Sequence, residues 1–345
     1  MTTISQRNYA LDWLKGWMII AVILLHTWLL PEFRGHLGVD VFFFISGFFL
    51  MHSYSRKKRT AVQYTWSRIQ QLSLPYFICL AVACLMHAGQ FLSIRDLDDI
   101  VRHGAEVVSA FSFMSEFGVI LSRDQLLIGS WYFSVLIIAS FLLYGMLEYN
   151  EKLTLCVLFP AIILFGFNSI IDRSASFSSW ERIGYLGIPL IRGTSEMAAG
   201  SLINAVYYRY KNSINKYQIL INIVGTISLV LFVFMFFAKQ DLDKYLVIFL
   251  PWILLSFLID QSWLNTLLAR IKGDPISRIG KYTLYILCAH FPAYMLVFWC
   301  NEHLLNHRLD GIPLAFVLLV FAALATVLLY FICQWIRSTI LTRKR

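Results

Sequence analysis

Charged residues are scarce in this chain. Aspartate, glutamate, lysine and arginine make up 14% of the 345 residues, whereas hydrophobic residues make up 59%. Soluble globular domains have about 25% charged and about 45–50% apolar residues, so this composition excludes an ordinary soluble domain and places most of the chain in a lipid bilayer. The net charge of +9 does not indicate a nucleic-acid partner, because the lysines and arginines are spread between the apolar runs and do not gather on one face.

The chain also lacks the cysteine and leader patterns of other protein classes. None of its six cysteines forms a CxxC pair, so we expect neither a metal site nor a disulfide framework and interpret the cysteines as packing residues. The first apolar run is not followed by a small-residue cleavage site. We therefore interpret this run as a retained helix and not as a signal peptide.

Long apolar runs recur along the whole chain. A helix that spans a bilayer needs about 20 mostly apolar residues. The sequence has ten such runs, which predicts an all-α, polytopic integral membrane protein with spans at 11–30, 37–54, 72–90, 131–149, 153–171, 183–206, 218–238, 245–263, 282–300 and 312–336. In the longest interval, 91–130, apolar residues recur at roughly helical spacing, so we expect an amphipathic helix there that lies on the membrane or covers a site.

The distribution of lysine and arginine predicts the orientation of the chain. With the N-terminus in the cytoplasm, the outer segments hold about half as many of these residues as the cytoplasmic segments. Ten spans then place both the N- and the C-terminus in the cytoplasm. Lys15 and Arg192 lie within spans, and topology does not explain them.

The first predicted span carries three ionisable side chains. Lys15 and His26 are eleven positions apart, which places them within roughly 20° of the same helix face and about 16 Å apart along the axis. Asp12 lies about one turn before Lys15, so we expect a local ion pair. The alternatives are a snorkelling lysine and a hydrogen-bonded structural histidine. The position of Lys15 and His26 on the same helix face favours a shared function over these alternatives.

The second predicted span begins with Asp40 at its outer end, close to where the first span ends. We therefore expect His26 and Asp40 to meet, because a carboxylate that holds an imidazole in one tautomer makes a general base. A helix N-cap is an equally good interpretation of Asp40. Ser46 and Gly47 indicate that the backbone of another helix approaches closely.

Other polar side chains lie in later spans. Arg192 and Glu196 are spaced to form an i,i+4 ion pair, for which a structural role is as plausible as a functional one. His290 lies about midway along a late span and is a candidate for acceptor binding, although a structural histidine is the more common case. Trp131 is a second candidate for acceptor binding, and its simplest interpretation is an interfacial anchor.

The motifs of the chain, taken in order, resemble those of acyltransferase family 3, the bacterial integral-membrane acyltransferases that modify surface polysaccharides. The first helix has a basic residue, ten intervening positions and a histidine, from Lys15 to His26, where the family more often begins with arginine. The chain departs from the pattern at Gln71, where members commonly have a second basic residue. The other matching segments are GVDVFFFISGFFL (38–50), SRIQQLSLPYF (67–77), SWYFSVLI (130–137), IRGTSEMAAG (191–200) and IGKYTLYILCAHFP (279–292).

The resemblance implies a bacterial cytoplasmic (inner) membrane O-acyltransferase. Such an enzyme moves an acyl group, usually acetyl from cytoplasmic acetyl-CoA, to a hydroxyl of a cell-surface glycan or its lipid-linked precursor, such as O-antigen, capsule or exopolysaccharide. It also implies that residues 1–345 form a single transmembrane acyltransferase domain with no appended soluble domain.

The resemblance also implies roles for particular residues. Acyl-CoA is polyanionic, so Lys57, Lys58 and Arg68 on the cytoplasmic side are candidate ligands of its phosphates, and Lys15 is a candidate ligand of a phosphate or of the start of the pantetheine arm. Positive-inside topology is the alternative for Lys57, Lys58 and Arg68. His26 then either deprotonates the acceptor hydroxyl or takes the acyl group itself.

Two other functions are compatible with the sequence. A proton-coupled secondary transporter would use Asp12, His26 and Asp40 as a relay and would move a solute without consuming acetyl-CoA. A non-enzymatic membrane partner or sensor would tolerate His26→Ala.

Overall fold

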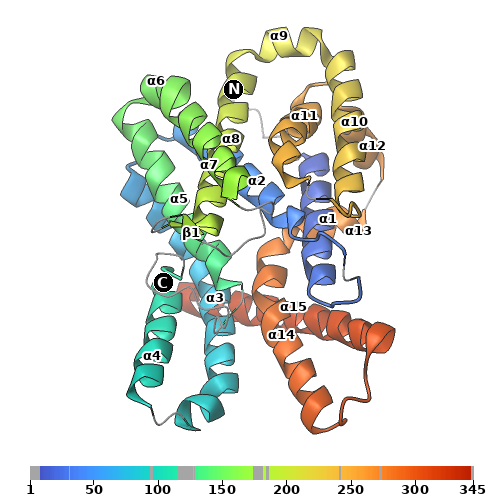
Figure 1. Cartoon of the computed structure of the whole chain (residues 1–345). Coiled ribbons are helices and arrows are strands. Elements are labelled where there is room, and N and C mark those ends of the chain that lie inside the picture. The colour runs from blue at the N-terminus through green and yellow to red at the C-terminus, as the bar shows by residue number, and fades with distance from the viewer. Residues whose placement is uncertain are drawn as a thin grey trace.

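The computed structural model describes residues 8–30, 32–93, 96–115, 127, 129–173, 182–183, 186–240, 242–271 and 274–342. Within this part of the chain the fold is almost entirely α-helical, as the apolar runs predict (Figure 1). The elements are α1 (Tyr9–Leu25), α2 (Leu37–Arg56), α3 (Ala61–Ser93), α4 (Leu97–Phe111), α5 (Ser130–Tyr149), α6 (Glu151–Leu153), a π-helical turn (Thr154–Leu158), α7 (Phe159–Arg173), β1 (Arg182–Ile183), β2 (Leu186–Gly187), α8 (Ile188–Arg209), α9 (Lys211–Lys216), α10 (Gln218–Met235), a 3₁₀ turn (Asp243–Tyr245), α11 (Leu246–Leu258), α12 (Trp263–Arg270), α13 (Pro275–Lys281), α14 (Thr283–His303) and α15 (Gly311–Thr342).

Polar residues mark the start of several helices. The side chain of Asn8 accepts a hydrogen bond from the Leu11 amide and caps α1. Asp274 accepts hydrogen bonds from two amides at the start of α13, and Pro275 follows it at the first helical position. Such side chains satisfy backbone amides that have no partner within the helix, and proline lacks the amide altogether.

The helices identify a multi-pass membrane protein. Seven helices of the described segments are long and apolar enough to cross a membrane, or eight when the bent pair formed by α11 and α12 is taken as one span. The two predicted spans outside this set correspond to α1 and α8. Helix α1 has 17 residues, which is shorter than a typical span. Helix α8 contains Arg192 and Glu196 together with several small polar residues, which lower its hydropathy.

Two predicted spans differ from the helices in their bounds. The predicted span 183–206 begins only at Ile188, because β1 and β2 form a two-stranded antiparallel hairpin before it. The predicted span 245–263 is broken, since α11 ends at Leu258 and α12 begins at Trp263 with a 55° bend between them. The expected amphipathic helix in 91–130 is present as α4, which carries most of its apolar side chains on one face.

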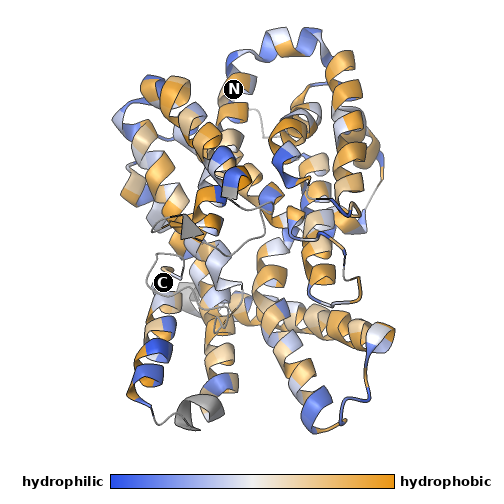
Figure 2. Cartoon of the chain, in the orientation of Figure 1, coloured by the Kyte–Doolittle hydropathy of each residue, from blue (hydrophilic) through white to orange (hydrophobic). Residues whose placement is uncertain are grey.

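The helices α2 and α5 form the interior of the molecule, whereas α15 lies at its periphery. In both α2 and α5, 72% of the apolar window is buried, compared with 22% in α15. Figure 1 shows α15 running across α3 and α14, with which it is in contact. Figure 2 shows that α10, α14 and α15 are mostly hydrophobic, while α9, α4 and the connection between α14 and α15 carry many hydrophilic residues. This pattern is expected of lipid-facing helices joined by polar segments.

Glycines allow α2 and α8 to pack closely, as the sequence predicts for Gly47. A Cβ atom on Gly47 would lie 1.9 Å from the Met197 carbonyl oxygen, and one on Gly200 would lie 2.0 Å from the Phe44 carbonyl oxygen. The two backbones are therefore in direct contact at these points. This contact places Asp40 of α2 beside Arg192 of α8.

Candidate active site

A cavity of about 430 Å³ opens among the helices α1, α2, α5, α8 and α14. It brings together three residues that the sequence singled out, namely His26, Trp131 and Arg192. The described residues that line it are Val22, Leu25, His26, Trp28, Leu30, His36, Val39, Phe42, Gly129, Trp131, Tyr132, Arg192, Leu287 and Phe291. Its walls are thus mostly apolar, with two imidazoles and a guanidinium among them, which is typical of a small-molecule site.

His26 directly follows the last residue of α1, and its side chain turns back to the last turn of the helix. Its Nδ1 lies 2.7 Å from the Val22 carbonyl oxygen. A carbonyl oxygen accepts hydrogen bonds and cannot donate them, so Nδ1 carries the proton of the neutral ring and Nε2 retains its lone pair. The ring packs edge-on against Phe291, with 4.6 Å between the ring centroids. The backbone of α1 therefore holds His26 in the tautomer that a general base requires.

His290 lies behind His26. Its side chain is fully buried, and its ring centroid lies 5.5 Å from that of His26. Its Nδ1 lies 3.0 Å from the Ile286 carbonyl oxygen, and among the described residues its buried Nε2 has no hydrogen-bond partner. His290 is not among the described residues that line the cavity, and its ring is a neighbour of the His26 ring.

Asp40 binds Arg192 and not His26, which corrects the expected pair. Both residues are buried, and the Arg192 guanidinium donates a hydrogen bond to Asp40 from α8, 152 positions away in the sequence. Contact of His26 with Asp40 was expected because the second predicted span begins at Asp40 on the outer side, close to where the first predicted span ends. The position of Asp40 is instead set by the close packing of α2 against α8.

The expected pair of Arg192 and Glu196 is present. Arg192 Nε lies 3.6 Å from Glu196 Oε1, and the Glu196 side chain is fully buried. Arg192 also donates to the His36 carbonyl oxygen at 3.4 Å. One guanidinium thus connects two carboxylates with the cavity wall, because Arg192 itself lines the cavity.

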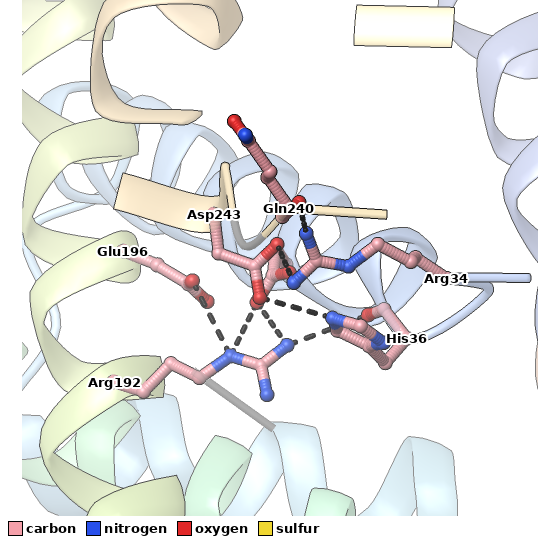
Figure 3. A network of polar contacts seen from close by, with 7 residues as sticks. Arg34, His36, Arg192, Glu196, Gln240 and Asp243 are labelled. Atoms are coloured by element: carbon pink, nitrogen blue, oxygen red, sulfur yellow. Dashed lines mark hydrogen bonds and ion pairs between the residues drawn. The ribbon is translucent and has the colours of Figure 1, made fainter. Parts of the chain in front are cut away.

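Three residues that the sequence did not single out extend this polar network. Asp243 is fully buried, and its carboxylate lies 3.0 Å from His36 Nε2 and 2.9 Å from Arg34 Nη2 (Figure 3). Arg34 also donates to the Gln240 carbonyl oxygen at 2.6 Å. The segment between α1 and α2 is therefore fixed to the segment between α10 and α11. The partners are more than 200 positions apart in the sequence, so no local spacing could have indicated them.

The predicted donor-binding residues lie in different surroundings. Lys15 forms the expected ion pair with Asp12, with 2.7 Å between Nζ and Oδ1. Lys57 and Lys58 are exposed between α2 and α3. Arg68 in α3 is half-buried, and among the described residues its Nε has no hydrogen-bond partner. Arg68 lies near enough to Tyr132, which lines the cavity, to act on it electrostatically.

Aromatic side chains form one wall and the rim of the cavity. Trp131 and Tyr132 lie in the first turn of α5, and the centroid of the Trp131 ring lies 6.2 Å from that of Phe43 in α2. Ser46 of α2 makes a side-chain contact with Tyr132, in addition to the close helix packing expected beside it. Trp28 is 75% exposed and has a φ of 57°, a left-handed conformation that is unusual for a bulky residue. Strained, exposed residues at the edge of a cavity are common at binding sites.

No group of three or more histidine, cysteine, aspartate or glutamate side chains in the described segments is arranged to hold a metal ion. The arrangement supports chemistry by a neutral imidazole in a mostly apolar cavity whose wall also includes the Arg192 guanidinium. Such a site can remove a proton from a bound hydroxyl and stabilise negative charge.

Comparison with known proteins agrees with the motifs. No curated protein and no solved structure was found to match the chain. A family model described as an acyltransferase domain matches residues 8–333, which is nearly the whole chain. The chain therefore belongs to acyltransferase family 3, a family of membrane acyltransferases.

Proposed function

We propose that the protein is an O-acyltransferase that moves an acetyl group from cytoplasmic acetyl-CoA to a hydroxyl of a cell-surface glycan or its lipid-linked precursor. The observation that carries this proposal is the tautomer of His26. Its Nδ1 is hydrogen-bonded to a backbone carbonyl oxygen, and its ring lines the cavity. Membership of an acyltransferase family supports acyl transfer as the reaction in which that imidazole takes part.

The transfer proceeds in two steps at one carbonyl carbon. The acceptor oxygen attacks the thioester carbon, the hydroxyl proton moves to His26 Nε2, and the carbonyl π electrons move to the carbonyl oxygen. The tetrahedral intermediate then collapses, the C–S bond breaks, and the thiolate of coenzyme A takes the proton from His26. An ester and a thiol result, and the imidazole returns to its neutral form.

The acyl donor approaches from the cytoplasmic side. Lys15 lies in the first half of α1 and His26 directly follows its last residue, about 16 Å further along the axis, which is of the same order as an extended pantetheine arm. Lys57, Lys58 and Arg68 provide cationic groups for the phosphates of coenzyme A. Arg68 is the strongest candidate of these three, since its guanidinium is half-buried and near Tyr132.

The acceptor approaches from the outer side. Trp28, Trp131 and Tyr132 offer flat apolar surfaces beside His26, which suit the apolar face of a sugar ring. An acceptor hydroxyl placed beside them lies within reach of the imidazole. A glycan of the bacterial surface is the acceptor class that this combination favours.

Ten spans with both termini in the cytoplasm of the bacterial inner membrane complete the proposal. They comprise the seven long apolar helices, the bent pair of α11 and α12, and also α1 and α8. Helix α8 can cross a bilayer despite Arg192 and Glu196, because both side chains face the protein interior and pair there.

Acetylation of the native surface glycan tests the proposal. A deletion strain is restored with wild type, His26→Ala, Lys15→Ala or the control His303→Ala, which changes an exposed histidine stacked on Trp299. Acetyl groups are measured by mass spectrometry, and membrane levels by immunoblot. We expect loss in the deletion strain, at least about a 100-fold lower rate in His26→Ala, and about a tenfold higher KM for acetyl-CoA in Lys15→Ala.

Each result of this experiment has a defined meaning. Unchanged acetylation in the deletion strain would refute the proposal for that glycan. Full activity of His26→Ala would be compatible with the proposed acyltransferase activity but would show that His26 is not its general base. His303→Ala should behave as wild type, because its side chain lies outside the residues that line the cavity.

A further inference from the structure

A second cavity, of about 400 Å³, lies between α1 and α10, which run side by side (Figure 1). Every described residue that lines it is apolar. The buried side chains of Leu14, Ala21 and Phe232 form its floor, while Val233 and Phe237 at its edge are 50% and 65% exposed. The cavity is therefore an open groove on the lipid-facing surface, which we call the α1–α10 groove.

The groove exists because its two helices pack mainly on other partners. Helix α1 packs mainly on α13, and α10 packs mainly on α11. The ends of α1 and α10 are nevertheless joined, since the Arg34 amide, in the segment after α1, donates to the Phe236 carbonyl oxygen at 3.0 Å. The Phe33 ring also stacks on that of Phe236, with 5.6 Å between the ring centroids. This end of the groove is therefore held in a fixed position beside the end of α1.

The groove meets the candidate active site at this same end. Leu30 lines both the groove and the active-site cavity. Along α1, Ala21 lines the groove, whereas the next residue, Val22, lines the active-site cavity. Helix α1 thus separates the two cavities along its length, and they adjoin where the helix has ended. A chain that lies in the groove would lead a group attached to its end past Leu30 to His26.

Two charged side chains lie at this end of the groove. Lys239 comes two positions after Phe237, and it pairs with Glu32, which lies between Leu30 and Phe33 in the sequence. Lys239 Nζ and Glu32 Oε2 are 3.9 Å apart, and the two side chains are 83% and 71% exposed. An exposed pair of this kind contributes little free energy. Lys239 can therefore exchange Glu32 for a more strongly charged anion, such as a phosphate.

The order of these features restricts the occupant of the groove. Its apolar walls offer no partner to a polar group, so they favour a hydrocarbon chain. The groove has a single helix on each side, which suits one chain better than the two chains of a phospholipid. Lys239 at its end suits a phosphate, and the cavity beyond suits a glycan. A glycan joined through a phosphate to one long hydrocarbon chain has these three parts in the same order.

We propose that the α1–α10 groove binds the chain of the acceptor, and that this acceptor is a glycan carried through a phosphate on a single polyprenyl chain. The inference rests on the proposed function and selects, from the acceptors that it allows, the lipid-linked precursor over the finished glycan. Lys239 binds the phosphate, and the chain holds the glycan beside His26. The groove binds a part of the acceptor that does not react, so its contribution belongs to KM and not to kcat.

Three acceptors prepared from the deletion strain test this inference. They are the lipid-linked glycan extracted into organic solvent, the same glycan freed from its chain by mild acid, and the finished surface glycan. The full-length protein in lipid nanodiscs is supplied with acetyl-CoA, and acetyl incorporation is measured by mass spectrometry. For the wild type we expect a KM for the lipid-linked glycan at least about tenfold below that for the freed glycan, because only the former has a chain to bury.

The substitution Val233→Trp fills the groove from α10. Val230→Trp is its matched control, since Val230 is 63% exposed in the same helix and is not among the described residues that line the groove. We expect Val233→Trp to raise the KM for the lipid-linked glycan about tenfold, with kcat within about twofold of wild type. The KM for the freed glycan should not change, and Val230→Trp should behave as wild type with all acceptors.

The substitution Lys239→Gln tests the phosphate contact separately. It should raise the KM for the lipid-linked glycan about threefold, as expected for an exposed charge contact, and leave the KM for the freed glycan unchanged. Lys216→Gln, which removes an exposed lysine of α9, is the control and should have no effect on either value.

The outcomes distinguish this inference from the proposed function. A wild type that acetylates none of the three acceptors would refute the proposed function. Acetylation of the finished glycan alone, or equal KM values for the lipid-linked and the freed glycan, would overturn the lipid-linked acceptor and leave the proposed function in place. A Val233→Trp variant that behaves as Val230→Trp would show that the groove holds bilayer lipid only. If Val233→Trp does not reach the membrane, Lys239→Gln decides, since an unchanged KM in that variant would also overturn the inference.

Discussion

At the scale of single residues, the pair of Asp40 and Arg192 makes a strong prediction about stability. Replacing Arg192 by Gln leaves the buried Asp40 and Glu196 carboxylates without their cation. Removing one partner of a buried ion pair costs about 3–5 kcal/mol, whereas replacing both partners is often close to neutral. We therefore expect Arg192→Gln to lower the Tm of the detergent-solubilised protein strongly, and the triple variant Asp40→Asn, Arg192→Gln, Glu196→Gln to restore much of it. Equal Tm values for the single and triple variants would contradict this account.

The same residues show which contacts a sequence can reveal. The pairs of Asp12 with Lys15 and of Arg192 with Glu196 were predicted correctly, because helix geometry alone brings residues three or four positions apart together. Asp40 was assigned the wrong partner, since its neighbour in space is decided by how α2 packs on α8. Asp243 had no local signal at all, because its partners lie in the segment between α1 and α2.

At the scale of helices, the contact between α2 and α8 predicts that an added methyl group destabilises the protein at Gly47. The same change at Gly89, which lies outside this contact, should not. A Cβ atom on Gly47 would meet the Met197 backbone, which cannot move without separating the helices, whereas one on Gly89 in α3 would meet no described atom within 4 Å. Gly47→Ala should destabilise the protein by about 1–3 kcal/mol, and Gly89→Ala should be neutral or stabilise it by about 0.5–1 kcal/mol. Tm values in detergent check both changes. A Gly47→Ala variant as stable as Gly89→Ala would contradict the direct backbone contact between α2 and α8.

Helix positions were predictable from the sequence because apolar runs of about 20 residues have few alternatives in a bilayer. Helix bounds were less predictable. The run 245–263 is apolar throughout most of its length, yet the chain bends after Leu258, and Ser262 caps the start of α12 with its hydroxyl 3.2 Å from the Asn265 amide. A capping serine inside an apolar run was the available signal for this break.

At the scale of the whole molecule, the polar network explains how a charged helix can belong to the membrane domain. Helix α8 carries Arg192 and Glu196 and is still buried along much of its length. Its charged groups are compensated by residues from α2 and from the turn before α11, which lie outside its own sequence. Hydropathy is calculated for each helix alone. It therefore underestimates how well a helix suits a membrane interior when its charges are neutralised by neighbouring helices.

The orientation of the segments on either side of α10 tests whether α8 crosses the membrane. If α8 spans the bilayer from the outer side, Lys211 in α9 is cytoplasmic, and Lys239, after α10, is outside. We expect a green fluorescent protein fused after Lys211 to fluoresce and an alkaline phosphatase fused after Lys239 to be active, with the converse fusions silent. A fusion after Arg59, in the segment between α2 and α3, is the cytoplasmic control. Active phosphatase after Lys211 would show that α8 does not cross, and the cavity would then lose the fixed position across the bilayer that a cytoplasmic donor and an outer acceptor require.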